Sequence, residues 1–139
     1  ISMDQVNPDL INHPRIHLHT SNDAYNRKFF TNRFQSKGMK FDIMIDDGPH
    51  TLESMIHFIT MYSPLLKENG IMVVEDVQQI GWIDILKTCT PSELAPYIEV
   101  YDRRNVKGRY DDILFVINKS RVAVTESSSA SVMNQYSYE

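Results

Sequence analysis

The sequence predicts an α/β fold in which an open, mostly parallel sheet is flanked by helices. Three observations predict it. Two short apolar runs, at residues 41–45 and 71–74, have the length of buried strands. The segment between them carries apolar side chains at helical spacing, and short polar connections separate the segments. Strands that alternate with helices favour parallel pairing, because each helix returns the chain to the start of the next strand.

The first part of the chain is interpreted as two strands and a helix. Residues 1–4 resemble the end of a strand, and residues 15–20 alternate between polar and apolar side chains. Ser21 can cap a helix over about residues 23–36. Gly38 would end that helix, because glycine readily adopts the left-handed conformation found after a last turn.

The middle of the chain predicts a strand, a helix and a second strand. Residues 41–45 are apolar almost throughout, which predicts a strand buried on both faces. Thr51 can cap the helix that follows, and Pro64 should shorten or kink its end. The Asn69–Gly70 pair then predicts a turn into the apolar run at 71–74.

The last part completes the domain. The patterns predict, in order, a helix near residues 80–88, a strand near 97–101, a basic loop at 103–109 and a strand at 113–118. We therefore place one domain at residues 1–120. Residues 121–139 are rich in serine and aperiodic, which predicts a flexible tail.

Composition limits the function classes. The 139 residues fit one globular domain, with 42% hydrophobic residues and a net charge of -4. Basic residues form no long stripe, so a nucleic-acid binder is not expected. No apolar run approaches the roughly 20 residues that span a bilayer. Cys89 is the only cysteine, which excludes an internal disulfide and fits a reducing compartment, so a cytoplasmic protein is predicted. A homo-oligomer remains open.

Polar residues follow the apolar runs, at the edge where open α/β sheets bind ligands. They are Asp4, Asp46, Asp47, His50, Glu75 and Asp76. Carboxylates gathered at one edge repel one another, and a hard divalent cation such as Mg²⁺ or Mn²⁺ relieves the repulsion. The sequence therefore predicts Asp47, Glu75 and Asp76 as metal ligands. His50 would stand beside the ion as a base, because an imidazole titrates near neutral pH.

Four stretches together resemble a known family: ISMD at 1–4, NDAY at 22–25, IDDGPHT at 45–51 and LLKENGIMVVEDV at 65–77. They are similar to class I S-adenosylmethionine-dependent methyltransferases, and most similar to the metal-dependent sugar O-methyltransferases of the macrocin and mycinamicin type. The resemblance covers about residues 1–118. It implies a Rossmann-like sheet and methyl transfer from S-adenosylmethionine to a sugar hydroxyl.

The resemblance also implies a role for each matching residue. Asp4 would bind the ribose hydroxyls of the cofactor, Asp23 and Ala24 would lie near its adenine, and Asp46 would contact it. The metal ligands would be Asp47, Glu75 and Asp76, and the catalytic base would be His50.

One part of the family pattern has no counterpart. The glycine-rich cofactor loop follows the first strand of that family, and this chain opens on what resembles the second strand. In that fold the first strand lies between the strands that end at Asp4 and Asp46. We therefore expect an N-terminally incomplete sheet, and weak or absent cofactor binding by the chain alone.

Several alternatives remain open at this stage. A catechol is a second candidate acceptor, because it shares a vicinal diol with sugars. A truncated, non-catalytic scaffold or dimerisation domain is a third reading. The aspartates at 46 and 47 could simply shape a helix start, and Asp23 could be a first-turn carboxylate. The basic loop at 103–109 could hold a phosphate or be solvated.

Overall fold

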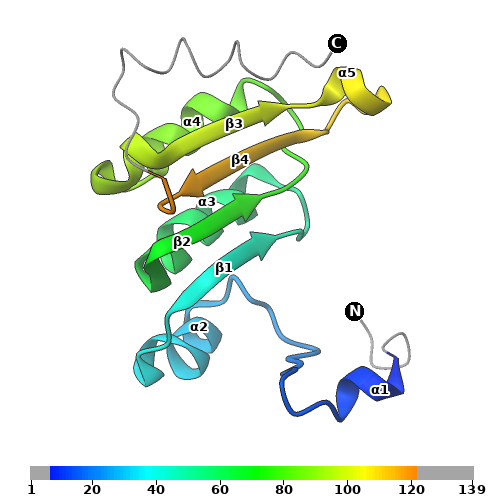
Figure 1. Cartoon of the computed structure of the whole chain (residues 1–139), viewed down its shortest axis with the longest axis vertical. Helices are drawn as coiled ribbons and strands as arrows, with labels where there is room; N and C mark the ends of the chain where they lie inside the picture. The colour runs from blue at the N-terminus through cyan, green and yellow to red at the C-terminus, as the bar shows by residue number, and fades with distance from the viewer. Residues whose placement is uncertain (1–6, 122–139) are drawn as a thin grey trace. The chain divides into compact units, whose positions relative to one another are not determined.

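The computed structural model describes residues 7–121, and Figure 1 shows its strands and helices. The chain divides into two units, residues 1–37 and residues 38–139, and each is described by itself. The predicted strand at residues 1–4, with Asp4, lies outside the described residues. The same is true of the predicted tail from residue 122 onward.

The first unit contains helices but, among its described residues, no strand. Its helices are α1 (Pro8–Ile11) and α2 (Arg27–Arg33), and a 3₁₀ turn, η2 (Gln35–Lys37), follows them. The strand predicted at residues 15–20 is therefore wrong. Instead, the His19 ring packs edge-on against Phe29 and Phe34, with ring centroids 5.9 and 6.0 Å apart. Alternation alone cannot produce a strand, because a strand also needs a neighbour to receive its hydrogen bonds.

Helix α2 is shorter than the predicted helix over residues 23–36, because its cap lies further along the chain. The Asn26 side chain accepts hydrogen bonds from the backbone amides of Lys28 and Phe29. Ser21, the predicted cap, instead has a left-handed backbone with φ of 57°. The helix also ends earlier than predicted, at Arg33, and Gly38, with a φ of 61°, instead follows the 3₁₀ turn η2.

The second unit contains a four-stranded sheet with the order β1-β2-β4-β3 (Figure 1). Only β1 and β2 pair in parallel, and β4 pairs antiparallel with both β2 and β3. The prediction of a mostly parallel sheet is therefore wrong. Parallel neighbours need a crossover that returns the chain to the start of the first strand, and the connection between β3 and β4 is too short for one. The strands are β1 (Phe41–Asp46), β2 (Leu66–Val74), β3 (Ile98–Asp102) and β4 (Ile113–Asn118).

The sequence expects a turn at Asn69–Gly70 before the second strand, but β2 already begins at Leu66. Its pairing with β1 shifts register between Phe41 and Ile43, so the residues just before Ile71 bulge out of the ladder. Glycine is needed here for space. A Cβ on Gly70 would lie 2.6 Å from a Leu66 methyl carbon and 3.1 Å from the Asp42 carbonyl oxygen.

Helices connect the strands of the second unit. Helix α3 ends at Tyr62, and Pro64 lies in the 3₁₀ turn that follows, which confirms that this proline shortens the helix. Among residues 7–121, no helix has the length and apolar character to cross a membrane. The elements are α3 (Leu52–Tyr62), η3 (Ser63–Leu65), α4 (Trp82–Cys89), η4 (Ser92–Tyr97) and α5 (Arg104–Lys107).

Thr51 caps α3 as the sequence predicts. Its hydroxyl accepts a hydrogen bond from the Ser54 amide, and the Ser54 hydroxyl accepts one from the Thr51 amide, which completes a capping box. We expect Thr51→Ala to lower the free energy of unfolding by about 1 kcal/mol in urea denaturation. Thr60→Ala is the matched control, because the exposed Thr60 hydroxyl bonds only to carbonyls within the helix.

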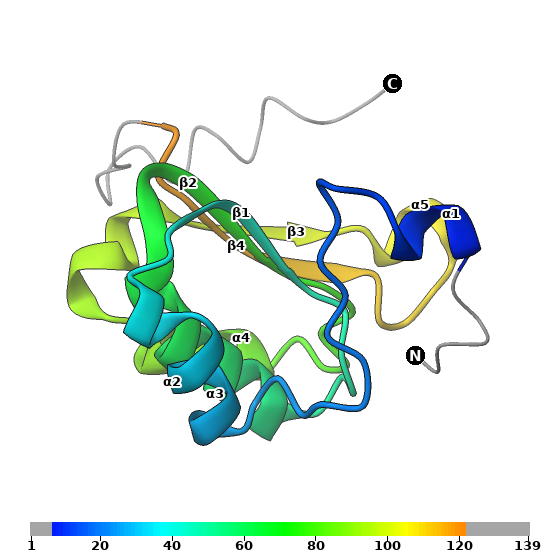
Figure 2. The ribbon, with the colours of Figure 1, turned by 90° about the horizontal axis from the view of Figure 1, so that it is seen from below.

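The two faces of the sheet differ in burial. Helices α3 and α4 lie on one side of the sheet (Figure 2). Residues Met44 and Asp46 of β1 are buried, whereas Ile43 and Ile45 are 62% and 58% exposed. The prediction that this strand is buried on both faces is therefore wrong. Successive side chains of a strand point to opposite faces, and only one face of β1 is covered by the elements described.

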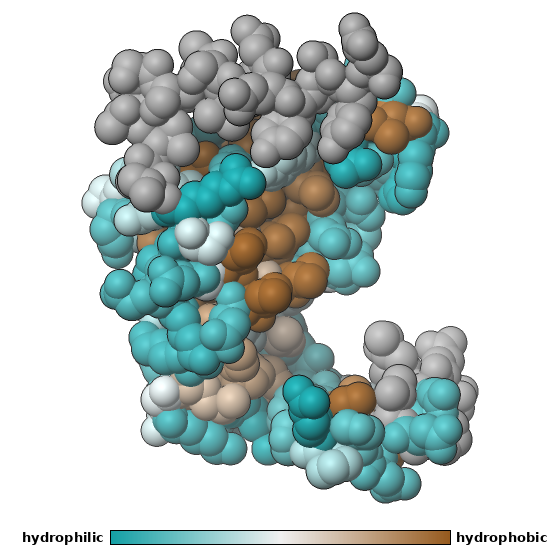
Figure 3. Space-filling model, viewed as in Figure 1, coloured by the Kyte–Doolittle hydropathy of each residue, from teal (hydrophilic) through white to brown (hydrophobic). Residues whose placement is uncertain are grey.

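The core of the second unit lies between the sheet and these helices. Its fully buried side chains come from α3, α4, β2 and β4, and they include Met55, Ile59, Met72, Val74, Leu86, Ile113, Phe115 and Ile117. On the opposite face, Figure 3 shows hydrophobic side chains across the middle of the sheet. The register places Ile43 beside Ile71, and Ile45 beside Val73, on this face.

Candidate functional site

The candidate site lies where β1 and β2 end side by side. The two strands run parallel, so the residues after Asp46 and Val74 leave the sheet at the same edge. The Glu75 amide donates a hydrogen bond to the Asp46 carbonyl at 3.0 Å, which keeps the strands in register up to the site. This local geometry brings residues that are distant in sequence next to one another.

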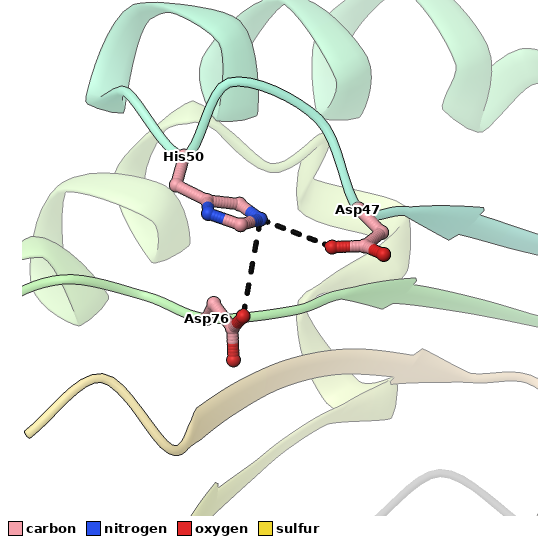
Figure 4. A group of neighbouring side chains, drawn as sticks. All are labelled: Asp47, His50 and Asp76. Carbon is pink, nitrogen blue, oxygen red and sulfur yellow. Dashed lines mark hydrogen bonds and ion pairs between the residues drawn. The ribbon is translucent and has the colours of Figure 1, made fainter. Parts of the chain in front are cut away.

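Three side chains converge at this edge: Asp47, His50 and Asp76 (Figure 4). The His50 Nε2 atom lies 3.1 Å from Asp47 Oδ1 and 3.9 Å from Asp76 Oδ2. Each residue offers one ligand atom, and these atoms all lie within 4.8 Å of one another. We call these three residues the site triad.

The backbone of the site triad is unusual. His50 and Asp76 have left-handed conformations, with φ of 55° and 50°. Residues other than glycine rarely adopt positive φ, although histidine and aspartate do so more readily than most. Such conformations cost about 1–3 kcal/mol each and cluster at functional sites. Both residues hold this unfavourable backbone, and their side chains point toward one another (Figure 4).

The site triad is accessible to a ligand from solvent. The side chains of Asp47, His50 and Asp76 are 66%, 30% and 21% exposed. Two carboxylates near each other repel unless a positive charge lies between them. The partial burial of Asp76 reduces screening by water, so a cation at this point would interact more strongly with Asp76 than with the largely exposed Asp47.

A positively charged residue, Arg109, adjoins the site triad. Its Nη2 atom lies 3.4 Å from Asp76 Oδ2, and its Nε atom lies 3.4 Å from Asp111 Oδ1. The pKa of Arg109 is raised, first by Asp111 and then by Asp76, so the guanidinium stays charged. The sequence interpretation put Arg109 in a basic loop and missed this contact. The only signal available was the loop's position before the last strand.

The structure does not bring every predicted ligand together. Glu75 lies between Val74 and Asp76 in the chain but is not one of the grouped residues. Asp76 has a left-handed backbone, with φ of 50°, so its side chain leaves the chain in a direction that strand alternation does not predict. Asp46 is buried at 8% exposure on the face of β1 shared with Met44, away from the exposed Asp47. Its expected contact with a cofactor stays a prediction.

The residues expected near adenine belong to the first unit. The Asp23 side chain accepts a hydrogen bond from the Tyr25 amide, and its carbonyl accepts one from the Asn26 amide, so Asp23 shapes the turn before α2. Asp23 also lines an open surface hollow with residues of α2, including Phe29 and Arg33. Ala24 lies in the same turn. The adenine role of both residues stays a prediction, as does the role of Asp4.

The donor set of the site triad fits a divalent cation. Two carboxylates suit Mg²⁺ or Mn²⁺, and the imidazole nitrogen adds a ligand that transition metals accept more readily than Mg²⁺ does. If both carboxylates and the ring bind, the set therefore favours Mn²⁺. With His50 outside the coordination sphere, the carboxylates and water would suit either ion.

No protein-family model matches the chain, and the search of curated proteins found no match. A solved structure, described as the crystal structure of the M1.HpyAVI–SAM complex, is similar at 24% identity with a TM-score of 0.43. The match covers 69% of this chain and 48% of that one, so the chain spans about half its length. A likeness at this TM-score supports no argument about fold or function.

Proposed function

We propose that the chain carries the cation site of a divalent-metal-dependent O-methyltransferase that transfers a methyl group from S-adenosylmethionine to a sugar hydroxyl. One observation supports this most directly. Asp47, His50 and Asp76 converge at the ends of two parallel strands and offer ligand atoms within 4.8 Å of one another. The IDDGPHT and VVED stretches that resemble sugar O-methyltransferases contain all three residues.

The residues of the site triad divide the chemistry between them. Asp47 and Asp76 would hold the ion. A bound divalent cation lowers the pKa of a hydroxyl beside it, and S-adenosylmethionine provides the methyl group. His50 would accept the proton of the sugar hydroxyl. If Nε2–H donates to Asp47, Nδ1 is the ring nitrogen left to accept that proton.

The position of β1 as an outer strand of the sheet fits the proposed family. Among the described strands, β1 pairs only with β2, so its other edge has no described partner. The resemblance places the family's first strand, with its glycine-rich loop, beside this edge. We therefore expect methyl transfer from a polypeptide that includes such a strand, and cation and diol binding from the chain itself.

The test uses the chain with a coloured vicinal diol, 4-nitrocatechol, whose absorbance changes when it chelates a metal. With Mg²⁺ present, we expect the wild-type chain to shift the spectrum beyond the effect of Mg²⁺ alone. EDTA should remove the shift and excess Mg²⁺ should restore it. A spectrum that is the same with wild-type chain and with Asp47→Ala would contradict the proposal.

A non-catalytic scaffold is a second candidate, and a specific observation favours it. The exposed Ile43 and Ile45 side chains lie on a sheet face that no described element of the second unit covers, and such apolar surfaces mark contacts with other proteins. A scaffold requires association but no ion. Sedimentation of the chain, together with Mn²⁺ binding, separates the two candidates, because only the enzyme proposal requires the ion.

A further inference from the structure

The connection between β3 and β4, residues 103–112, contacts the site triad and the residues that follow it. Arg109 contacts Asp76, as described above. The next residue along the chain is Tyr110, whose hydroxyl donates a hydrogen bond to Gln78 Oε1 at 2.9 Å. The Gln78 side-chain Nε2 in turn donates one to the Asp76 carbonyl at 3.0 Å. The Val77 amide also donates to the Ile113 carbonyl at 3.0 Å. Residues from the connection therefore stand beside the proposed cation site.

Internal contacts fix the shape of this connection. The Arg103 amide donates to the Asp112 carbonyl at 2.8 Å, which closes its base. The Arg104 guanidinium binds the Asp102 carboxylate through Nε at 2.8 Å and Nη2 at 2.6 Å. Gly108, with φ of 67°, then ends α5 and reverses the chain. Side chains at the tip are consequently presented from an ordered backbone.

Two cations of this connection are left without a counter-charge. Arg104 and Arg109 pair with carboxylates, whereas Arg103 and Lys107 make no ion pair with any residue in the described part of the chain. Arg103 is the residue just before the single turn of α5, and Lys107 is the last residue of that turn. Both are exposed, and the neighbouring Val106 and Tyr110 are 63% and 69% exposed.

We propose that Arg103 and Lys107 bind a phosphate group on the acceptor, an inference that rests on the proposed function and names its substrate as a phosphorylated sugar. A guanidinium matches two phosphate oxygens at once, and an ammonium adds a point charge. The exposed Tyr110 ring, in the same connection, offers a flat surface for a sugar ring. A free sugar phosphate and a nucleotide-linked sugar share this chemistry.

Charge favours a single phosphate over a nucleic acid. The chain has a net charge of -4, and Arg109, in the same connection as the two unpaired cations, contacts Asp76 of the site triad. A long phosphate backbone would extend past the cations and meet the carboxylates of the site triad, which would repel it. A small acceptor would place one phosphate on the cations and its hydroxyls toward the site.

The test measures binding of glucose 1-phosphate to the 139-residue chain by phosphorus NMR, with glucose followed by proton NMR. The double variant Arg103→Ala/Lys107→Ala should bind the phosphate roughly tenfold more weakly, because each exposed charge contact contributes about a factor of three. Lys87→Ala/Lys119→Ala is the matched control, since it removes the same charge from α4 and from the segment after β4. It should leave the affinity unchanged. UDP-glucose separates the two acceptor sources. Tighter binding of UDP-glucose than of glucose 1-phosphate would favour a nucleotide-linked sugar, and the reverse would favour a free sugar phosphate.

Two outcomes would overturn the inference: equal losses in the two double variants, or tighter binding of a single-stranded oligonucleotide that is lost in the loop variant. Asp47→Ala distinguishes this failure from failure of the proposed function. We expect that variant to keep phosphate binding and to lose cation binding. If the wild-type chain binds phosphate through residues 103–112 but binds no Mn²⁺, the proposed cation site is contradicted and the proposed phosphate site is not.

Discussion

Replacing Asp47 or Asp76 by alanine is expected to weaken Mn²⁺ binding by the chain at least about a hundredfold, because even the outer partners of metal ligands are worth roughly 10–100-fold in affinity. Each variant removes one of the two carboxylates that meet at His50. Asp76→Ala has a second effect, since it leaves the Arg109 guanidinium near the ion with one carboxylate partner fewer. Electron paramagnetic resonance of free Mn²⁺ measures the affinity directly.

Glu75→Ala is the matched control for these variants. It removes a carboxylate from the residue next to Asp76, but Glu75 is outside the grouped ligands. We expect a change of at most about threefold, the size of an exposed charge effect. A loss as large as that of Asp47→Ala would show that Glu75 binds the ion, as the sequence interpretation proposed.

His50→Ala separates two roles of the ring. If His50 is a ligand, the variant should lose Mn²⁺ affinity as the aspartate variants do. If it is the base, the ion should still bind, while methyl transfer by a polypeptide with the cofactor loop should slow by about 10²–10⁴-fold, the usual contribution of acid–base catalysis.

Ile117→Ala should lower the free energy of unfolding by about 2–5 kcal/mol, the usual cost of truncating a buried aliphatic side chain. Ile117 lies on β4, is fully buried, and pairs with Met72 of β2 and Ile98 of β3. No described element could collapse into the space without moving the sheet or the helices. Urea denaturation, followed by circular dichroism, measures the loss.

Ile45→Ala is the control for this variant. The chemical change is the same and both residues lie in strands, but Ile45 is 58% exposed. We expect a loss below about 1 kcal/mol, since little surface is removed from water when an exposed side chain is truncated. Equal losses would mean that the open face of β1 is covered in solution, for example by another copy of the chain.

The sequence predicted local structure well wherever short-range chemistry decides it. The strand at 113–118 and the apolar run of β1 are confirmed, and so are the Thr51 cap and the helix end before Pro64. Each of these depends on side chains a few residues apart. A cap needs an oxygen near the first amides, and a proline beyond the first turn of an α-helix lacks the amide that the helical hydrogen bond requires.

Pairing between distant segments was predicted less well. The antiparallel insertion of β4 between β2 and β3 depends on which edges are free when the sheet assembles, and no local pattern records that. The alternation at residues 15–20 has the period of a strand, yet His19 packs on phenylalanine rings instead. Periodicity describes which side chains can share a face, not whether a partner strand exists.

The candidate site shows the same division. Strand-end position was enough to predict that Asp47, His50 and Asp76 would meet, because parallel neighbours end at one edge. It could not separate Glu75 from Asp76, since that depends on backbone angles at a single residue. Nor could it find Arg109, which reaches Asp76 from 33 positions away along the chain.

The left-handed backbones of His50 and Asp76 set thermal stability against the proposed metal binding. Glycine at either position would relax a conformation that costs about 1–3 kcal/mol, and it would delete a donor atom at the same stroke. Libraries selected only for heat resistance should accumulate such relaxed sequences and lose the metal binding proposed above. Engineers who want a sturdier version of this chain should look for gains in the first unit and leave the tips of β1 and β2 untouched.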